Sequence, residues 1–119
     1  MPTKDEIRQK LRTATKSLTT SAQDIFSTVT ERTMRNVVLI LLMGDGTSRT
    51  VDITIAGERS GTIFDNVPVA PADLVQLPKE GFDIENPVVV CEGGTKLQAA
   101  QSAGSGVTLT CLYWDDEER

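Results

Sequence analysis

Histidine is absent from the 119 residues of the sequence. This absence excludes the Ser-His-Asp and Cys-His catalytic arrangements and the His-Glu-x-x-His zinc motif, and it removes the commonest metal ligand. The sequence also lacks the Gly-x-Ser-x-Gly motif that exposes a nucleophilic serine at a sharp turn. With no ordinary base available to a nucleophile, we expect a protein that is not an enzyme and that needs no cofactor.

Cysteine is scarce, with only Cys91 and Cys111 in the whole chain and no Cys-x-x-Cys motif. Two cysteines are too few for a four-ligand zinc site without other ligands. Both lie in strand-like stretches, and the chain has the character of a protein made in a reducing compartment. We therefore expect two small buried apolar side chains in preference to a disulfide.

Long apolar runs are also missing. The longest, residues 37–43, has the length of a strand and not the roughly 20 residues of a membrane-spanning helix. The first residues are polar, unlike a signal peptide. Aromatic residues make up 4% of the chain, too few for a stacking platform for nucleic acid or sugar. We expect a soluble protein that is made in a cytoplasm and has no membrane partner.

The net charge of −5 is unevenly divided along the chain. Residues 1–35 hold seven Lys and Arg against four Asp and Glu, a net +3, and the remainder holds −8. An acidic body argues against nucleic-acid binding, whereas a basic front end suits an acidic partner. The candidate partner-contact residues are Lys4, Arg8, Lys10, Arg12 and Lys16.

Residues 1–16 form the only convincing helix candidate. Pro2 or Thr3 opens it, and acidic residues in its first turn suit the helix dipole. Ile7 and Leu11 make only a narrow apolar stripe. We therefore expect residues 1–17 to form a short docking helix or a flexible arm, and not part of the core.

The pattern changes to that of strands after residue 17. Residues 50–55 alternate apolar and polar side chains, which predicts a half-buried strand, and the glycine-containing turn 44–48 predicts a hairpin with the run 37–43. Prolines recur through the middle of the chain, as on edge strands and connections. We expect an all-β fold, an antiparallel β-sandwich of seven to eight short strands over residues 18–114, followed by an acidic tail at 115–119.

Several motifs admit both a chemical and a structural interpretation. Gly44-Asp45-Gly46 lacks the remaining residues of a phosphate or calcium loop, so a hairpin turn is favoured there and at Gly93-Gly94. Tyr113 and Trp114 are either a binding surface or, as we expect, the closure of one end of the sandwich. Four acidic residues suit either pairing for acid–base chemistry or calcium, or turn capping, which is favoured: Asp65, Asp73, Asp83 and Glu85.

The order of these segments resembles a known family. The residues that carry the resemblance are 63–77, the Pro-Val-Val-Val of 87–90, the Gly-Thr-Lys-Leu-Gln-Ala-Ala of 94–100 and the Val-Thr-Leu-Thr of 107–110. Together they are similar to the small β-sandwich virion proteins of tailed bacteriophages, over roughly residues 18–114. The resemblance implies a jelly-roll-like fold and a structural protein in many copies on the virion, made in the cytoplasm of the host bacterium.

The resemblance leaves the position on the particle open. It implies either a capsid decoration (cement) protein bound to the major capsid protein, or a neck, collar or tail attachment protein bound to other virion proteins. Copies would form a homo-oligomer or a symmetric array, with the basic arm in a groove of an acidic lattice, becoming ordered on docking. A carbohydrate- or calcium-binding β-sandwich module is the alternative that the turn aspartates suggest.

Overall fold

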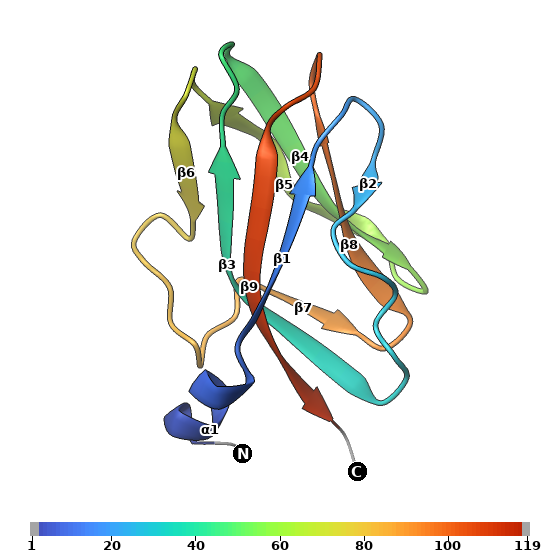
Figure 1. The fold of residues 1–119 in the computed structure, drawn as a ribbon. Helices are drawn as coiled ribbons and strands as arrows, with labels where there is room; N and C mark the ends of the chain where they lie inside the picture. Colours follow the sequence, from blue (N-terminus) through green and yellow to red (C-terminus); the bar gives the residue numbers. More distant parts are fainter. Residues whose placement is uncertain (1–2, 118–119) are drawn as a thin grey trace.

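The structure is a computed structural model that describes residues 3–117, and it consists of two β-sheets packed face to face with one short helix (Figure 1). This confirms the predicted all-β sandwich. In chain order the elements are α1 (Lys4–Lys10), β1 (Arg12–Ser17), β2 (Gln23–Asp24), β3 (Thr33–Met43), β4 (Arg49–Gly57), β5 (Gly61–Val69), β6 (Leu74–Leu77), β7 (Val89–Glu92), β8 (Thr95–Gln101) and β9 (Thr108–Glu117).

The strand order is that of a jelly roll. In the front sheet β1 pairs with β9, β9 with β3, and β3 with both β6 and β7. In the back sheet the order is β2-β8-β4-β5, and every strand pair is antiparallel. When β6 and β7 are taken together as one interrupted strand, eight strands remain, and consecutive strands change sheet everywhere except at the β4–β5 hairpin of the back sheet, as two Greek keys require.

The predicted hairpins are wrong. β3 lies in the front sheet and β4 in the back sheet, so residues 44–48 cross between sheets, as do Gly93 and Gly94 between β7 and β8. The 44–48 loop is anchored instead to the loop after β5. The Gly44 amide donates to the carbonyl of Asp73, and the Ala72 amide donates to the carbonyl of Asp45, both at 2.7 Å. These bonds replace the ladder that a hairpin would have formed.

The main core lies between the two sheets. The alternating residues of β4 turn inward as predicted, with Val51, Ile53 and Ile55 all buried. The strand β5, at the edge of the back sheet, carries Pro68, which fits the predicted use of proline on edge strands. The largest side chains that are fully enclosed in this core are Leu18, Ile40, Leu42, Ile53, Leu97 and Leu109.

Both cysteines belong to the main core and are free, which confirms their predicted role. Cys91 on β7 and Cys111 on β9 are fully buried. Burial raises the pKa of each thiol to about 11, because the charged thiolate loses its solvation there. Both side chains therefore act as small apolar groups.

A second, smaller core covers the outer surface of the front sheet. Ile7 of α1 packs there with Val38, Ile84 and Trp114, all buried. The Trp114 indole Nε1 donates to the carbonyl of Ile84 at 3.0 Å. Trp114 therefore lies beneath α1 and the 79–87 loop, and the prediction that it closes the end of the sandwich is wrong.

The predicted boundaries at both ends of the sandwich need correction. The helix ends at Lys10, since Leu11 is already extended, and residues 12–17 form β1, paired along its length with β9. The front sheet therefore includes part of the expected arm. Strand β9 continues to Glu117, so residues 115–117 are not a free tail. Residues 1–2 and 118–119 lie outside the described residues. No helix within residues 3–117 is long and apolar enough to cross a membrane.

Candidate interaction surfaces

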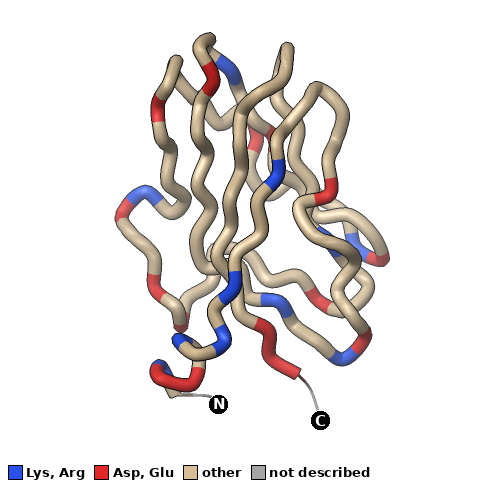
Figure 2. The backbone as a smooth tube through the Cα atoms, viewed as in Figure 1, with Lys and Arg blue, Asp and Glu red and all other residues tan. Residues whose placement is uncertain are grey.

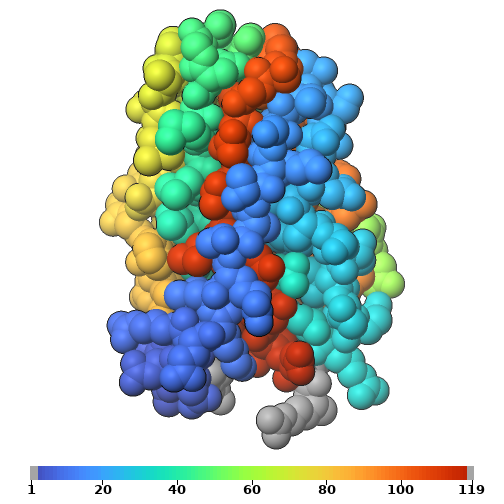
Figure 3. Space-filling model, viewed as in Figure 1, coloured from blue at the N-terminus to red at the C-terminus, as the bar shows by residue number. Residues whose placement is uncertain are grey.

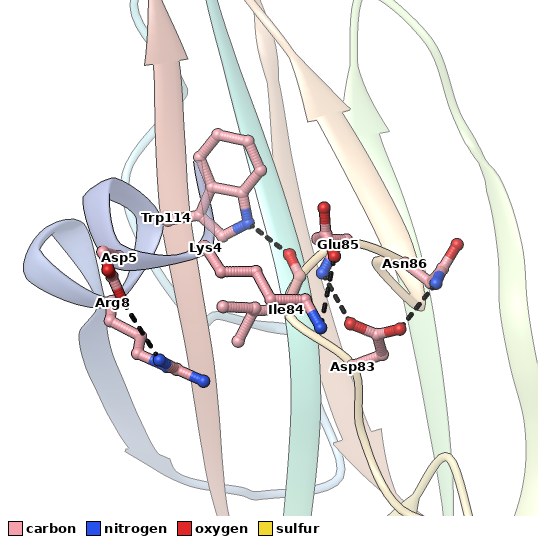
Figure 4. Close-up of polar contacts among 8 residues, drawn as sticks. All are labelled: Lys4, Asp5, Arg8, Asp83, Ile84, Glu85, Asn86 and Trp114. Carbon is pink, nitrogen blue, oxygen red and sulfur yellow. Dashed lines mark hydrogen bonds and ion pairs between the residues drawn. The ribbon is translucent and has the colours of Figure 1, made fainter. Parts of the chain in front are cut away.

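The short helix α1 is fixed to the body of the protein at several points. Thr3 caps it, with its Oγ1 accepting from the Glu6 amide at 3.2 Å. Ile7, only 2% exposed, inserts into the second core. At the helix start the Lys4 ammonium lies 3.5 Å from the Glu85 carboxylate (Figure 4). The helix is thus docked on the protein's own sheet.

The loop that receives Lys4 is itself built by an aspartate. Asp83 accepts hydrogen bonds from the Glu85 amide at 3.0 Å and from the Asn86 side chain at 2.8 Å (Figure 4). These bonds, the backbone one first, lower the pKa of Asp83. Asp73 likewise accepts from the Leu74 amide at 2.9 Å. Turn capping, the favoured interpretation of these two carboxylates, is therefore confirmed.

The five predicted contact residues divide into two groups. Lys4 is paired with Glu85, and Arg8 lies 3.2 Å from Asp5 on the same helix. Both cations are thus engaged in exposed ion pairs. The other three are exposed and have no ion-pair partner within residues 3–117: Lys10, Arg12 and Lys16. These three residues are called the basic edge below.

The basic edge runs from the end of α1 along β1, the outermost strand of the front sheet (Figure 2). Arg12 and Lys16 are separated by four residues of strand, about 13 Å at the usual rise. Ala14 between them packs against the main core, so the side chains of Arg12, Ala14 and Lys16 share the inner side of the strand. At a sheet edge this position keeps charged groups at the rim of the sandwich, where they are exposed.

Charges at these positions also have a structural use. An edge strand offers unpaired backbone groups to other strands, and inward-pointing charges discourage such pairing. Arg12 and Lys16 fit this description, because a strand added beside β1 would have to cover both cations. The basic edge can therefore guard the sheet and attract an acidic surface at the same time.

The front sheet also presents an uncharged surface, which the sequence analysis missed. Antiparallel register arranges it in three rows above α1. The first row holds Ser17, Thr108, Met43 and Leu74; the second holds Thr15, Thr110, Leu41 and Gln76; the third holds Thr13, Leu112 and Leu39. None of these eleven side chains is charged, although 24% of the residues in the chain are. This set is called the uncharged face below.

Two of the most exposed apolar side chains meet on this face. Met43 and Leu74 are direct partners across β3 and β6, and they are 48% and 52% exposed. The signal in the sequence was the threonine alternation of residues 13–17 and 108–110. It marks a surface only once the strands are known to be neighbours (Figure 3).

The acidic residues do not gather into a cation site. Within residues 3–117 no group of three or more His, Cys, Asp or Glu side chains is placed to hold a metal ion. Asp65 on β5 instead faces Asp52 on β4, whose hydrogen bond and charge raise the pKa of Asp65. Asp45 accepts from the Thr47 amide at 2.9 Å and from Arg49 at 3.2 Å, which lowers its pKa.

Comparison with protein-family models and with curated proteins finds no match for this chain. The class of protein defined so far is a small jelly-roll β-sandwich with a helix docked on its front sheet.

Proposed function

We propose that this protein is a non-enzymatic structural protein of a tailed-phage virion, which decorates the outside of the capsid shell and stabilises it. One agreement carries the proposal. The pattern of residues 18–114 resembles small virion proteins with a jelly-roll-like fold, and the strands follow jelly-roll order. Jelly rolls recur in viral capsid proteins, although the fold also occurs in lectins and enzymes.

The shape of the molecule suits repeated attachment to a surface. Its backbone forms a slab of 45 × 29 × 18 Å with a continuous core between the sheets. The one helix is tied to the sheet by Ile7 and by the ion pair of Lys4. A slab of this kind binds with little loss of conformational freedom, because most of it is ordered before it docks.

The basic edge supplies the contact with the shell. Its members Lys10, Arg12 and Lys16 have no ion-pair partner within residues 3–117 and can meet acidic groups of the shell. The rest of the chain is acidic and would face outward, away from the shell. Each exposed ion pair contributes only about 0–1 kcal/mol. Many copies on one lattice, held also by contacts with one another, make such weak contacts sufficient.

Binding to isolated shells tests this contact. Arg12→Gln with Lys16→Gln should weaken co-sedimentation with shells by roughly three- to tenfold, the loss expected for two exposed pairs. Arg32→Gln with Lys79→Gln is the matched control, since these exposed cations also have no ion-pair partner within residues 3–117. Wild-type binding should fall as salt is added. Equal binding by both double variants would remove the basic edge from the account.

Immunogold labelling of purified particles tests the location. Gold distributed over the shell supports decoration. Gold confined to one vertex or to the tail base would replace decoration with a neck or tail attachment role. Gold found only in infected-cell lysate, and never on particles, would contradict a virion protein altogether.

A further inference from the structure

The uncharged face of the front sheet has no partner within the described chain. Val38 and Trp114 below it are buried in the second core, and Leu39 and Leu112 of the third row pack against that core. The first two rows, whose side chains are all exposed or half-buried, are its open part. Met43 and Leu74 in the first row are each about half exposed. Adjacent exposed apolar side chains on a flat surface without charge are typical of an interaction site.

We propose that the uncharged face packs against the same face of a second copy of this chain. The inference deepens the proposed function and rests on it in one respect, since it names the surface through which neighbouring copies touch on the particle. The occupant is argued from charge, from the arrangement of side chains and from area.

Charge favours a second copy over a charged partner. The chain carries −5, so two copies repel one another across most orientations. The stretches of β3, β6 and β9 over this face carry neither blue nor red in Figure 2, and Lys16 of β1 shares the inner side of its strand with Ala14. Face-to-face contact therefore brings two acidic molecules together without placing like charges opposite each other.

The side chains on the face are sorted by strand. β1 and β9 contribute hydroxyls except at Leu112, and the Thr15 and Thr110 oxygens already lie 3.1 Å apart. β3 contributes Leu39, Leu41 and Met43, and β6 contributes Leu74 and Gln76. A two-fold axis lying in the face and crossing the strands sets each strand against its own copy. Leu41 and Thr110 of the middle row then meet their own copies, and Met43 meets Leu39, as an isologous interface requires. Thr108 against Leu112 is the one mixed pair on β3 and β9.

The area of the face sets the strength of the contact. Four strands about 4.8 Å apart, over about five residues at about 3.3 Å each, give roughly 300 Å² in projection. A stable dimer buries roughly 800 Å² per partner. The contact is therefore weak in dilute solution, and it becomes effective where copies are already held side by side.

Disulfide trapping tests the geometry directly. Thr110 lies in the middle row on the central strand β9, so Thr110→Cys places thiols from two copies near the proposed axis. The native cysteines are fully buried and do not compete. The matched control is Thr54→Cys, which places a thiol on the outer surface of the central strand β4 of the back sheet. Under mild oxidation, the first variant should form covalent dimers at least tenfold faster than the control.

Sedimentation at rising protein concentration provides the second readout. The wild-type chain and Phe82→Asp should show the same concentration-dependent dimer, because Phe82 is exposed but lies in the 79–87 loop, outside the face. Met43→Asp and Leu74→Asp should stay monomeric, with unchanged circular dichroism. A monomeric wild type with equal crosslinking of both cysteine variants overturns the inference. So does a dimer that survives Met43→Asp and Leu74→Asp.

These results separate the inference from the proposed function. Crosslinking through Thr110→Cys with no protein on purified particles would keep the contact and remove the virion role. Protein on particles, without selective crosslinking either in solution or on the particle surface, would keep the virion role and remove the contact.

Discussion

Arg35 on β3 donates two hydrogen bonds to Asp115 on β9, from Nε to Oδ1 at 2.8 Å and from Nη2 to Oδ2 at 2.9 Å. The same guanidinium lies 4.3 Å from the ring centre of Tyr113 and 4.6 Å from that of Phe26. The hydrogen bonds to Asp115 raise the pKa of Arg35. Phe26 belongs to the main core and Tyr113 packs against it, so this arrangement joins β3 and β9 beside that core.

Removing Asp115 should therefore destabilise the fold. Asp115→Ala leaves a guanidinium that is only 17% exposed without its acceptor, and we expect a loss of about 1–3 kcal/mol. Urea denaturation measures the change. Asp5→Ala is the control, because the Arg8–Asp5 pair is exposed and should contribute close to nothing. Equal effects of the two substitutions would deny the Arg35–Asp115 pair a special role in stability.

Repulsion between Asp52 and Asp65 should lower the stability of the folded protein at neutral pH. Because the pKa of Asp65 is raised by Asp52, the folded state binds this proton more tightly than the unfolded state does. The destabilising repulsion is present above the raised pKa, and it is relieved as the pH falls through it.

Asp52→Asn should remove that repulsion while keeping the Oδ1 that accepts from the Asn66 amide at 2.8 Å. We expect the pKa of Asp65 to fall toward its usual value of 3.8 and the melting temperature at pH 7 to rise. Carboxyl NMR titration of Asp65 measures the first effect directly. A pKa of Asp65 that does not move in the variant would contradict the pairing.

The two thiols should be unreactive in the folded protein. Burial holds the pKa of Cys91 and Cys111 at about 11, so each remains neutral and enclosed near pH 8. A colourimetric thiol assay should detect neither group before unfolding and both in concentrated urea. Rapid modification of one thiol under native conditions would show that the sheet around it opens readily.

The docking of α1 can be followed through Trp114, the single tryptophan of the chain. Ile7→Ala removes the apolar side chain that packs beside the indole, at a cost of about 2–4 kcal/mol to helix docking. Trp114 emission should shift to longer wavelength while the circular dichroism of the sheets persists. Leu11→Ala, at the partly buried rim of the same cluster, should have a smaller effect. Unchanged emission in Ile7→Ala would place the helix elsewhere.

The strands could be predicted from the sequence more readily than their partners. The alternation of residues 50–55 depends on one buried surface, and β4 has one. A five-residue connection such as 44–48 can join two strands of a hairpin or cross between two sheets. Only the packed structure shows which of the two connections it makes. β1 escaped prediction because an edge strand needs little apolar surface, and Ala14 is its one side chain packed on the main core.

The candidate site shows the same division. The positions of the basic residues are evident from the sequence. The ion pair of Lys4 with Glu85 is not, because Glu85 lies far along the chain in the 79–87 loop. The alternation of β9 puts Trp114 on the face opposite Tyr113, but what covers it there, α1 and Ile84, comes from distant parts of the chain. The irregular register of β3 between Val37 and Leu39 lets both Val38 and Leu39 reach the same cluster. No local pattern announces a bulge of this kind.

The central claim is that the protein is a stoichiometric part of a virion. Quantitative mass spectrometry of purified particles tests it most directly, by counting copies of this chain against the major capsid protein. The account predicts a fixed ratio that persists through repeated density-gradient purification. Loss of the chain during purification, while the particles remain intact, would contradict it.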